Sequence, residues 1–234
     1  MEVGFYKDLL KSIEKNRELL AILIDPDKFD VSKTHLFLKS IPKQTSHLFV
    51  GGSDVGNGET DRTVKALKLN SQLPIFLFPG DHSQISEQAD ALLFLTLLSG
   101  RNPEYLIGQQ VKAVGLLKNT SLEIIPTGYI LIDGGIVSAV SRITKTEPIS
   151  QDSLDLIINT AVAGQYMGAK FIYLEAGSGA LFPIDPIIIS EVKKAIKIPL
   201  IVGGGIKTEL QKQSAYKAGA DMVVMGTVYE KEMI

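Results

Sequence analysis

Eight short apolar runs recur along the 234-residue chain, and this repetition constrains the fold more than any other feature. Apolar and polar residues do not alternate within them, which is typical of parallel strands buried on both faces. Most runs are separated by segments with helical spacing, so strand and helix are expected to alternate eight times. This order favours an α/β fold of the closed (β/α)8 or TIM barrel type, formed as a single domain over residues 1–234, over a doubly wound open sheet. The runs are LLAILID (19–25), HLFVGG (47–52), PIFLFP (74–79), ALLFLT (91–96), EIIPTGYILI (123–132), KFIYLEAG (170–177), PLIVGGG (199–205) and MVVMGT (222–227).

Helix signals fill most of the connections. Asp185 followed by Pro186 is an N-cap with proline in the first turn, and Gly168 and Gly219 stand where helices end. Helical spacing covers residues 58–69, 103–117, 152–167 and 210–218. An amphipathic segment at about 5–16 is expected to close the floor of the barrel.

Two connections depart from the repeat. Residues 80–90, GDHSQISEQAD, are polar and have room for about two helical turns, so the third helix is expected to be shortened or replaced. This would open a groove beside the strands in which an apolar chain could lie, although a short helix without function fits as well. Seven residues follow Thr227, so a helix after the last strand should be short or absent.

Composition excludes several classes of function. The net charge of -2 gives no basic field for nucleic acid, so an anionic substrate must be held by backbone amides or a metal ion. The absence of cysteine excludes disulfides and thiolate catalysis and is compatible with a cytoplasmic location. No signal peptide or membrane-spanning run is present, and His35, His47 and His82 form no metal-ligand pair.

The first two strands each end in oxygen-bearing side chains. Asp25 comes directly after strand one, and Ser53 follows the glycines that end strand two. Because active sites of these barrels lie at the carboxyl ends of the strands, both should face one cavity. Mg²⁺ prefers such oxygen ligands and shares its coordination with substrate phosphates, so we predict that Asp25 and Ser53 bind Mg²⁺. The alternatives are a helix cap at Asp25 and a simple turn at Ser53, while Asp27 is interpreted as a turn or capping residue.

Strand six ends in a single acid followed by a loop of small residues. Glu175 could accept the proton of a bound hydroxyl, which is the work of a general base, unless it only pairs with a lysine. Tyr173 should face the same side as Glu175 and offer its phenol to a polar substrate. The loop that follows could bind phosphate through its amides.

Glycine-rich ends of strands seven and eight predict a phosphate site. The segments are Gly203-Gly204-Gly205 and, about twenty residues later, Gly226-Thr227. Loops at these positions with a helix N-terminus nearby bind phosphate recurrently in this fold, because exposed amides attract a dianion.

Taken in order, DPDK, VGGSD, PTGYILIDGG, YLEAGSGA, VGGGI and AGADMVVMGT resemble the geranylgeranylglyceryl phosphate synthases and their bacterial prenylglyceryl phosphate relatives. The resemblance covers residues 19–230, and YLEAGSGA is its most discriminating motif. It implies Mg²⁺ at Asp25 and Ser53, glycerol 1-phosphate along residues 173–179, and catalysis by Glu175 with Tyr173. It also implies that Tyr129 and residues 101–105 line or limit a groove for the prenyl tail. The substrate-binding residues that it implies are Tyr173, Leu174, Glu175, Ala176, Gly177, Ser178, Gly179, Gly203, Gly204, Gly205, Gly226 and Thr227.

The implied activity is the alkylation of sn-glycerol 1-phosphate by geranylgeranyl diphosphate, which gives a prenylglyceryl phosphate and pyrophosphate. The resemblance further implies a homo-oligomer and a product delivered to the membrane. A heptaprenyl donor, a phosphosugar isomerase or synthase of the histidine and tryptophan pathway type, and a barrel that only binds a ligand are the alternatives.

Overall fold

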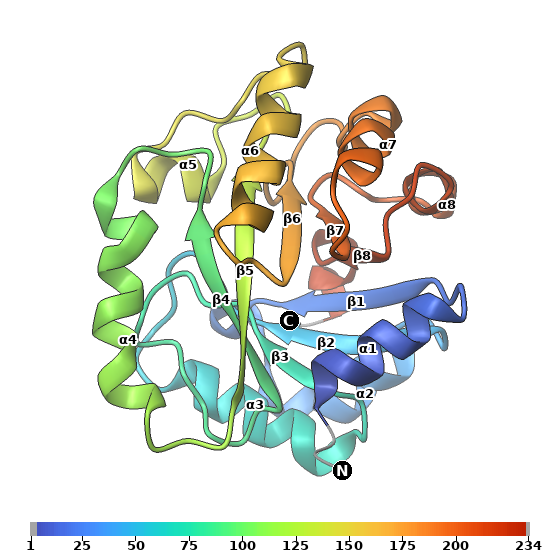
Figure 1. Cartoon of the computed structure of the whole chain (residues 1–234). Coiled ribbons are helices and arrows are strands. Elements are labelled where there is room, and N and C mark those ends of the chain that lie inside the picture. The colour runs from blue at the N-terminus through green and yellow to red at the C-terminus, as the bar shows by residue number, and fades with distance from the viewer. Residues whose placement is uncertain (1–3, 233–234) are drawn as a thin grey trace.

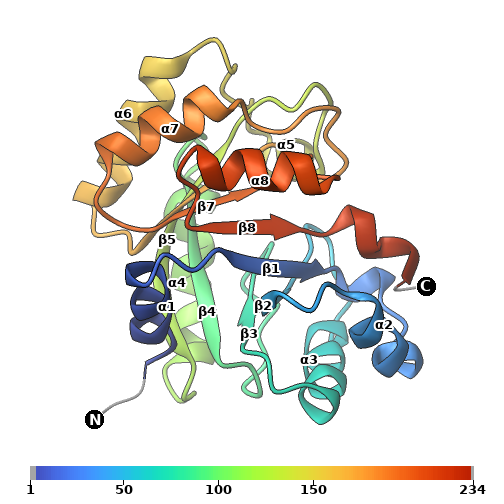
Figure 2. The ribbon, with the colours of Figure 1, turned by 90° about the vertical axis from the view of Figure 1, so that its right-hand side faces the viewer.

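The computed structural model of the chain describes residues 4–232 and contains a closed barrel of eight parallel strands in sequential order, with β8 pairing back onto β1. All strands point the same way, so their carboxyl ends gather at one end of the barrel (Figures 1 and 2). The predicted (β/α)8 barrel and its eight strand positions are confirmed. The strands are β1 (Leu19–Ile24), β2 (Thr45–Val50), β3 (Ile75–Leu77), β4 (Ala91–Leu97), β5 (Glu123–Leu131), β6 (Phe171–Glu175), β7 (Leu200–Gly203) and β8 (Met222–Met225).

Each strand places alternate side chains in two apolar layers. In β6, Phe171 and Tyr173 belong to the cluster inside the barrel, whereas Ile172 and Leu174 belong to the cluster between strands and helices. Both layers are buried, which explains why the strands read as continuous apolar runs.

The helices surround this sheet (Figure 1). As predicted, α6 ends shortly before Gly168 and α8 shortly before Gly219, and the Asp185 carboxylate caps α7 by accepting a hydrogen bond from Ile187 N at 2.7 Å. Among residues 4–232, no helix is long and apolar enough to cross a bilayer. The helices are α1 (Phe5–Glu14), α2 (Thr34–Ser40), α3 (Glu59–Asn70), α4 (Gln109–Leu117), α5 (Ala139–Thr144), α6 (Leu154–Tyr166), α7 (Pro186–Ala195) and α8 (Glu209–Lys217), with 3-10 helices at Pro26–Lys28, Val31–Lys33 and Thr227–Glu232.

The connection between β3 and β4 contains no helix at all over residues 78–90. The expected two helical turns are therefore wrong, whereas the replacement of the third helix is confirmed. The buried Gln84 side chain organises the segment instead: its Oε1 accepts from Gly52 N and Gly80 N, and its Nε2 donates to Gly52 O at 2.8 Å. The Gln84 amide thereby satisfies backbone groups of Gly80 in this connection and of Gly52 in the loop after β2.

The predicted helix over 103–117 is interrupted at its start. Glu104–Gly108 forms a π-helix, and the α-helix α4 follows directly. Such π-turns are rare and are frequently found at functional sites.

Helix α1 closes the amino-terminal end of the barrel, opposite the strand tips (Figure 2). Leu9 packs into the interior cluster, and the rings of Phe5 and Tyr6 meet Phe76 and Phe171 edge-on. The Glu123 carboxylate at the start of β5 accepts a hydrogen bond from Tyr6 N, an orphan amide of the first helical turn. The predicted role of this helix as the barrel floor is confirmed.

We expect Leu9→Ala to lower the free energy of unfolding by about 2–5 kcal/mol, because it removes a buried apolar side chain and leaves a cavity in the floor. Leu9 is 3% exposed, whereas Leu69 in α3 is 85% exposed, so Leu69→Ala is the matched control and should change stability little. Denaturant unfolding of both variants measures the difference. Equal effects of the two substitutions would contradict the role of α1 in closing the floor of the barrel.

Candidate functional site

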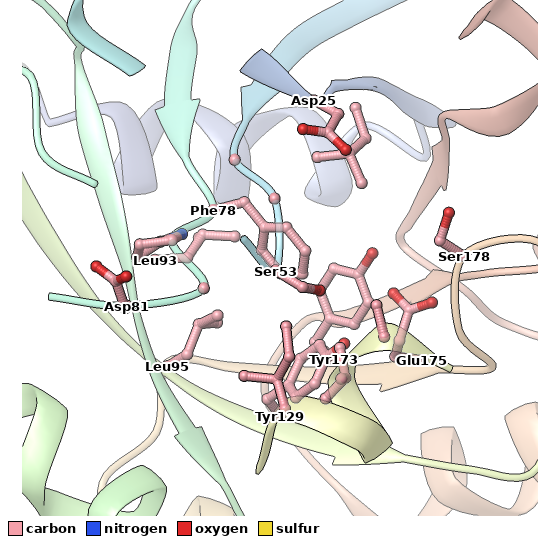
Figure 3. A pocket seen from close by; sticks show the side chains of 18 of the residues that line it. Asp25, Ser53, Phe78, Asp81, Leu93, Leu95, Tyr129, Tyr173, Glu175 and Ser178 are labelled. Atoms are coloured by element: carbon pink, nitrogen blue, oxygen red, sulfur yellow. The ribbon is translucent and has the colours of Figure 1, made fainter. Parts of the chain in front are cut away.

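One cavity of about 390 Å³ occupies the mouth of the barrel at the carboxyl ends of the strands. Asp25 and Ser53 line it from the ends of β1 and β2, and Tyr173 and Glu175 line it from β6 (Figure 3). The groups predicted to hold a metal and the group predicted to act as base therefore open onto the same space.

The Glu175 carboxyl group is nearly enclosed, with 5% of the residue exposed. Its Oε1 accepts a hydrogen bond of 2.7 Å from Gly177 N. Burial raises the pKa of Glu175 to about 7, and the Gly177 amide and nearby Tyr173 hydroxyl oppose this shift only in part. No lysine pairs with this carboxylate among the described ion pairs, so the simple structural role weighed for Glu175 is not observed. A carboxyl group that titrates near neutral pH can take up a proton during a reaction.

Tyr173 stands beside Glu175 and presents an unsatisfied hydroxyl. The residue is fully buried, and among the described residues its hydroxyl lies close enough to Glu175 to favour the carboxylate but makes no hydrogen bond of good geometry. Burial raises the pKa of Tyr173 well above its usual range, so the phenol stays neutral. A buried hydroxyl without a partner is costly, and a polar substrate in the cavity would relieve that cost.

The glycines at the end of β7 make room for this pair. A Cβ atom on Gly203 would lie 2.3 Å from the Tyr173 hydroxyl oxygen, and one on Gly204 would lie 2.4 Å from Glu175 Oε1. Both distances are far below van der Waals contact. Gly204 also has a φ of 78°, which L side chains rarely adopt.

Asp25 and Ser53 supply oxygen atoms on the opposite side of the cavity. The Asp25 carboxylate accepts from Asp27 N at 3.2 Å and lies 3.4 Å from Lys28 Nζ, so it also caps the short 3-10 helix that follows β1. Burial raises the pKa of Asp25, while Lys28 counteracts this. A Cβ atom on Gly52 would come within 2.7 Å of Asp25 Oδ1, so the loop after β2 closes tightly over the carboxylate.

Among residues 4–232, no group of three or more histidine, aspartate or glutamate side chains is arranged to hold a metal by protein ligands alone. Two hard oxygen donors facing a shared cavity suit Mg²⁺ of the kind that is completed by water and substrate phosphates. Asp27 has a different function: its carboxylate accepts a hydrogen bond from Gly56 N at 2.8 Å and thereby anchors the loop after β2.

The predicted phosphate cradle lies next to Glu175. Ser178, Gly204, Gly205, Gly226 and Thr227 all line the cavity, and the hydroxyl oxygens of Ser178 and Thr227 lie 3.4 Å apart. Helix α8 begins with a capping box that uses the amides of Thr208 and Gln211, and none of its residues is among those that line the cavity. The loops therefore offer backbone amides and hydroxyl groups to an anion, and Lys207 also lines the cavity, with its Nζ donating to Ala180 O at 2.8 Å.

The other predicted substrate residues lie behind this surface. The Leu174 side chain points into the outer apolar cluster, so it cannot reach the cavity. Gly177 N donates a hydrogen bond to the Glu175 carboxylate, and Ala176 N donates one to Gly203 O. Gly203 lies against the Tyr173 hydroxyl. Together with Gly179, these residues shape the loops that present Ser178 and Glu175.

An apolar half of the cavity extends across β4 (Figure 3). Leu93 and Leu95 line it from inside the barrel, and Leu92 and Phe94 line it from the outer face of the same strand. Ala113 of α4 also borders it. The space reaches the outer face of β4 because the connection over residues 78–90 contains no helix that could cover that face.

Of the two predicted groove segments, Tyr129 lines the cavity, and in residues 101–105 Tyr105 does so from the π-helix. Arg101 instead donates to the carbonyl oxygens of Leu98 and Gly100, and Asn102 donates to Thr144 O at 2.8 Å. These two residues fix the loop and do not border the groove.

Sequence reasoning missed several residues that line the site. Phe78 stacks on Tyr173 with ring centroids 5.1 Å apart and contacts Tyr129 at 5.8 Å. Val140 and Ile143 of α5 close another wall. In the sequence, Phe78 lies near the end of an apolar run and looks like one more core residue. The segment that forms α5 contains no recognisable motif.

Comparisons with known proteins agree with this geometry. The PcrB family matches residues 11–234. A geranylgeranylglyceryl phosphate synthase of Zunongwangia profunda is 53% identical over 95% of this chain and 95% of its own length.

Two solved structures share the whole fold. The wild-type synthase of Thermoplasma volcanium aligns with a TM-score of 0.89 and 37% identity, covering 98% of this chain and 92% of its own. The Thermoplasma acidophilum (S)-3-O-geranylgeranylglyceryl phosphate synthase in complex with sn-glycerol-1-phosphate aligns with a TM-score of 0.88 and 34% identity over the same shares. The chain therefore belongs to the PcrB family, and its relatives are geranylgeranylglyceryl phosphate synthases, as the strand-end motifs predicted.

Proposed function

We propose that this protein transfers a geranylgeranyl group from its diphosphate to the free hydroxyl of sn-glycerol 1-phosphate, which forms an ether bond and releases pyrophosphate. The observation that carries this function is the shape of one cavity with two unlike halves. A buried base and an anion cradle form the polar half, and leucine and aromatic side chains form the apolar half. A phosphorylated acceptor and a long apolar donor need both halves at once.

The polar half suits glycerol 1-phosphate. Amides and hydroxyl groups of the loops after β6, β7 and β8 bind the phosphate, which places the glycerol hydroxyl toward Glu175 and Tyr173. As the hydroxyl oxygen bonds to C1 of the donor, Glu175 accepts its proton. The sn-glycerol-1-phosphate in the complex of the Thermoplasma acidophilum relative supports this choice of acceptor.

The residues around Asp25 fit Mg²⁺, with Asp25 and Ser53 as its protein ligands. When bound, Mg²⁺ supplies positive charge that stabilises the departing diphosphate. The close approach of Gly52 to Asp25 restricts the orientation of the carboxylate, and Asp25 and Ser53 line the same cavity.

The apolar half suits the prenyl tail, since burial contributes about 0.8 kcal/mol per CH₂ group. The names of the relatives favour geranylgeranyl over a heptaprenyl donor. A phosphosugar isomerase or a simple phosphate binder would leave the apolar surface on both faces of β4 without a ligand. Assembly into a homo-oligomer, a cytoplasmic location and delivery of the product to the membrane stay predictions from the sequence resemblance.

A direct assay tests the function. The protein is incubated with Mg²⁺, sn-glycerol 1-phosphate and prenyl diphosphates of increasing length, and lipid-soluble phosphate is extracted. Geranylgeranyl diphosphate should give product. If no donor gives product, the proposed transfer is wrong.

Glu175→Gln should lower turnover by at least ~10²-fold, because glutamine keeps the shape of the side chain and cannot take up the proton. Glu87→Gln, at an exposed position between β3 and β4, is the matched control and should keep normal turnover. Steady-state rates with thermal unfolding as a check of folding measure both. Near-normal turnover of Glu175→Gln would remove Glu175 as the base.

The pH dependence should follow the Glu175 pKa of about 7. A base works only when deprotonated, so kcat/KM should fall about tenfold per pH unit below this value and level off above it. Because the folded-state pKa is raised, the stability that the protonated form contributes is lost as pH rises through about 7. Glu175→Gln should therefore unfold at higher temperature than the wild type at pH 8, with little difference below about pH 4.5, the ordinary pKa of glutamate. A rate profile without a break near neutrality would argue against this assignment.

Asp25→Asn should raise the Mg²⁺ concentration needed for half-maximal activity, or abolish activity, because it removes the charged ligand. Asp27→Asn is the control, since an amide oxygen can still accept from Gly56 N and this residue does not line the cavity. Titration of activity with Mg²⁺ compares the variants. Full wild-type turnover in the presence of a chelator would refute the metal assignment.

A further inference from the structure

We propose that the Phe78 ring is a catalytic residue that stabilises the positive charge developing on the allylic carbons of the prenyl donor. This inference rests on the proposed prenyl transfer and assigns a role in it to a residue that no motif singled out. The role differs from that of a wall for the apolar tail, because it acts on the reacting carbons.

Phe78 lies between the two reacting ends of the cavity (Figure 3). Its carbonyl oxygen packs so closely against the loop that carries Ser53 that a Cβ atom on Gly51 would come within 1.8 Å of it. Its ring stacks on Tyr173, whose hydroxyl adjoins Glu175. The carbon that leaves the diphosphate and joins the acceptor must pass between these two ends, and Phe78 borders that space.

The ring has three aromatic neighbours, one of which is Phe49, stacked at a centroid distance of 6.3 Å. Phe78 and Tyr173 stack with an interplanar angle of 19°, and Tyr129 is tilted against both at centroid distances of 5.8 Å and 5.4 Å. Burial raises the pKa of both tyrosines well above their usual range, so they offer neutral rings and no phenolate that could trap a carbocation. Phe78 itself is only partly buried, so it is the ring of the stack that remains accessible from the cavity.

The chemistry needs a stabiliser of positive charge that is not a nucleophile. As the C1–O bond of the donor breaks, its electron pair leaves with the diphosphate, and positive charge spreads over C1 and C3. The glycerol hydroxyl oxygen then bonds to C1, and its proton passes to Glu175. An aromatic face attracts a cation by about 0.5–2 kcal/mol without forming a bond to it.

Fluorinated phenylalanines at position 78 test the proposal, because fluorine weakens the attraction of the ring for a cation with little change in shape. We expect single-turnover rates to fall in the order phenylalanine, 4-fluoro-, 3,5-difluoro- and 3,4,5-trifluorophenylalanine, by roughly 3- to 30-fold in total. The KM for the prenyl diphosphate should stay within about twofold, since the tail keeps its contacts.

The same series at Phe76 is the matched control. Phe76 is fully buried in the barrel floor, where its ring meets Phe5 and His47, and it does not line the cavity. Its fluorination should leave the rate unchanged.

Three results would overturn the role of Phe78: a flat series, an equal slope at Phe76, or a change in donor binding without a change in rate. Phe78→Leu gives a second measure, with thermal unfolding to separate a loss of rate from a loss of fold. Wild-type protein that forms product while the Phe78 series is flat refutes the ring's role alone. Wild-type protein that forms no product refutes the proposed transfer, and this inference with it.

Discussion

The buried carboxyl group of Glu175 sets the requirements for the loops around it. It needs a hydrogen-bond donor, which is the amide of Gly177, and it needs space, which the absence of a side chain at Gly204 provides. The glycines after β7 make room for Glu175 and Tyr173, and in the proposed function their backbone also binds the phosphate of the acceptor. A larger residue at Gly203 would collide with the Tyr173 hydroxyl, and one at Gly204 would collide with the Glu175 carboxylate. For this reason the glycine-rich motif and the acid at the end of β6 act as one unit.

The second constraint is the missing helix between β3 and β4. In a complete barrel, a helix covers the outer face of each strand, and the cavity ends at the strand tips. Here the outer residues of β4, Leu92 and Phe94, contribute to the cavity together with the inner residues Leu93 and Leu95. The 2% exposed Gln84 anchors the connection without a helix, because it bonds to Gly80 within the connection and to Gly52 in the loop after β2. The groove is thus a consequence of the missing helix, and the hydrogen bonds of Gln84 hold the connection in its place.

The sequence predicted the features that depend on local pattern. Burial on both faces made all eight strands readable, and Asp25 and Glu175 were found because the carboxyl end of a strand is a fixed place in this fold. The sequence did not predict features that depend on contacts between distant segments. These are the hydrogen bonds of Gln84 to Gly52 and Gly80, the π-turn before α4, and the stacking of Phe78 on Tyr173. Leu174 shows the same limit on a smaller scale. A motif includes it beside Glu175, but alternation along β6 turns its side chain into the outer layer.

The polarity of the cavity determines which atoms meet. In the proposed reaction, a donor with a charged head and an apolar tail can bind in one direction only, because Asp25 and Ser53 line one part of the cavity and the leucines of β4 line another. In this proposal the reacting carbon falls at the boundary, where Phe78, Tyr129 and Tyr173 gather. An allylic carbon that develops positive charge reacts with any nearby nucleophile, so water must be kept from this boundary. The enclosure that excludes water also removes solvent from Glu175, and its pKa rises as a result. Protection of the reacting carbon and a base that titrates near neutral pH thus have the same physical cause.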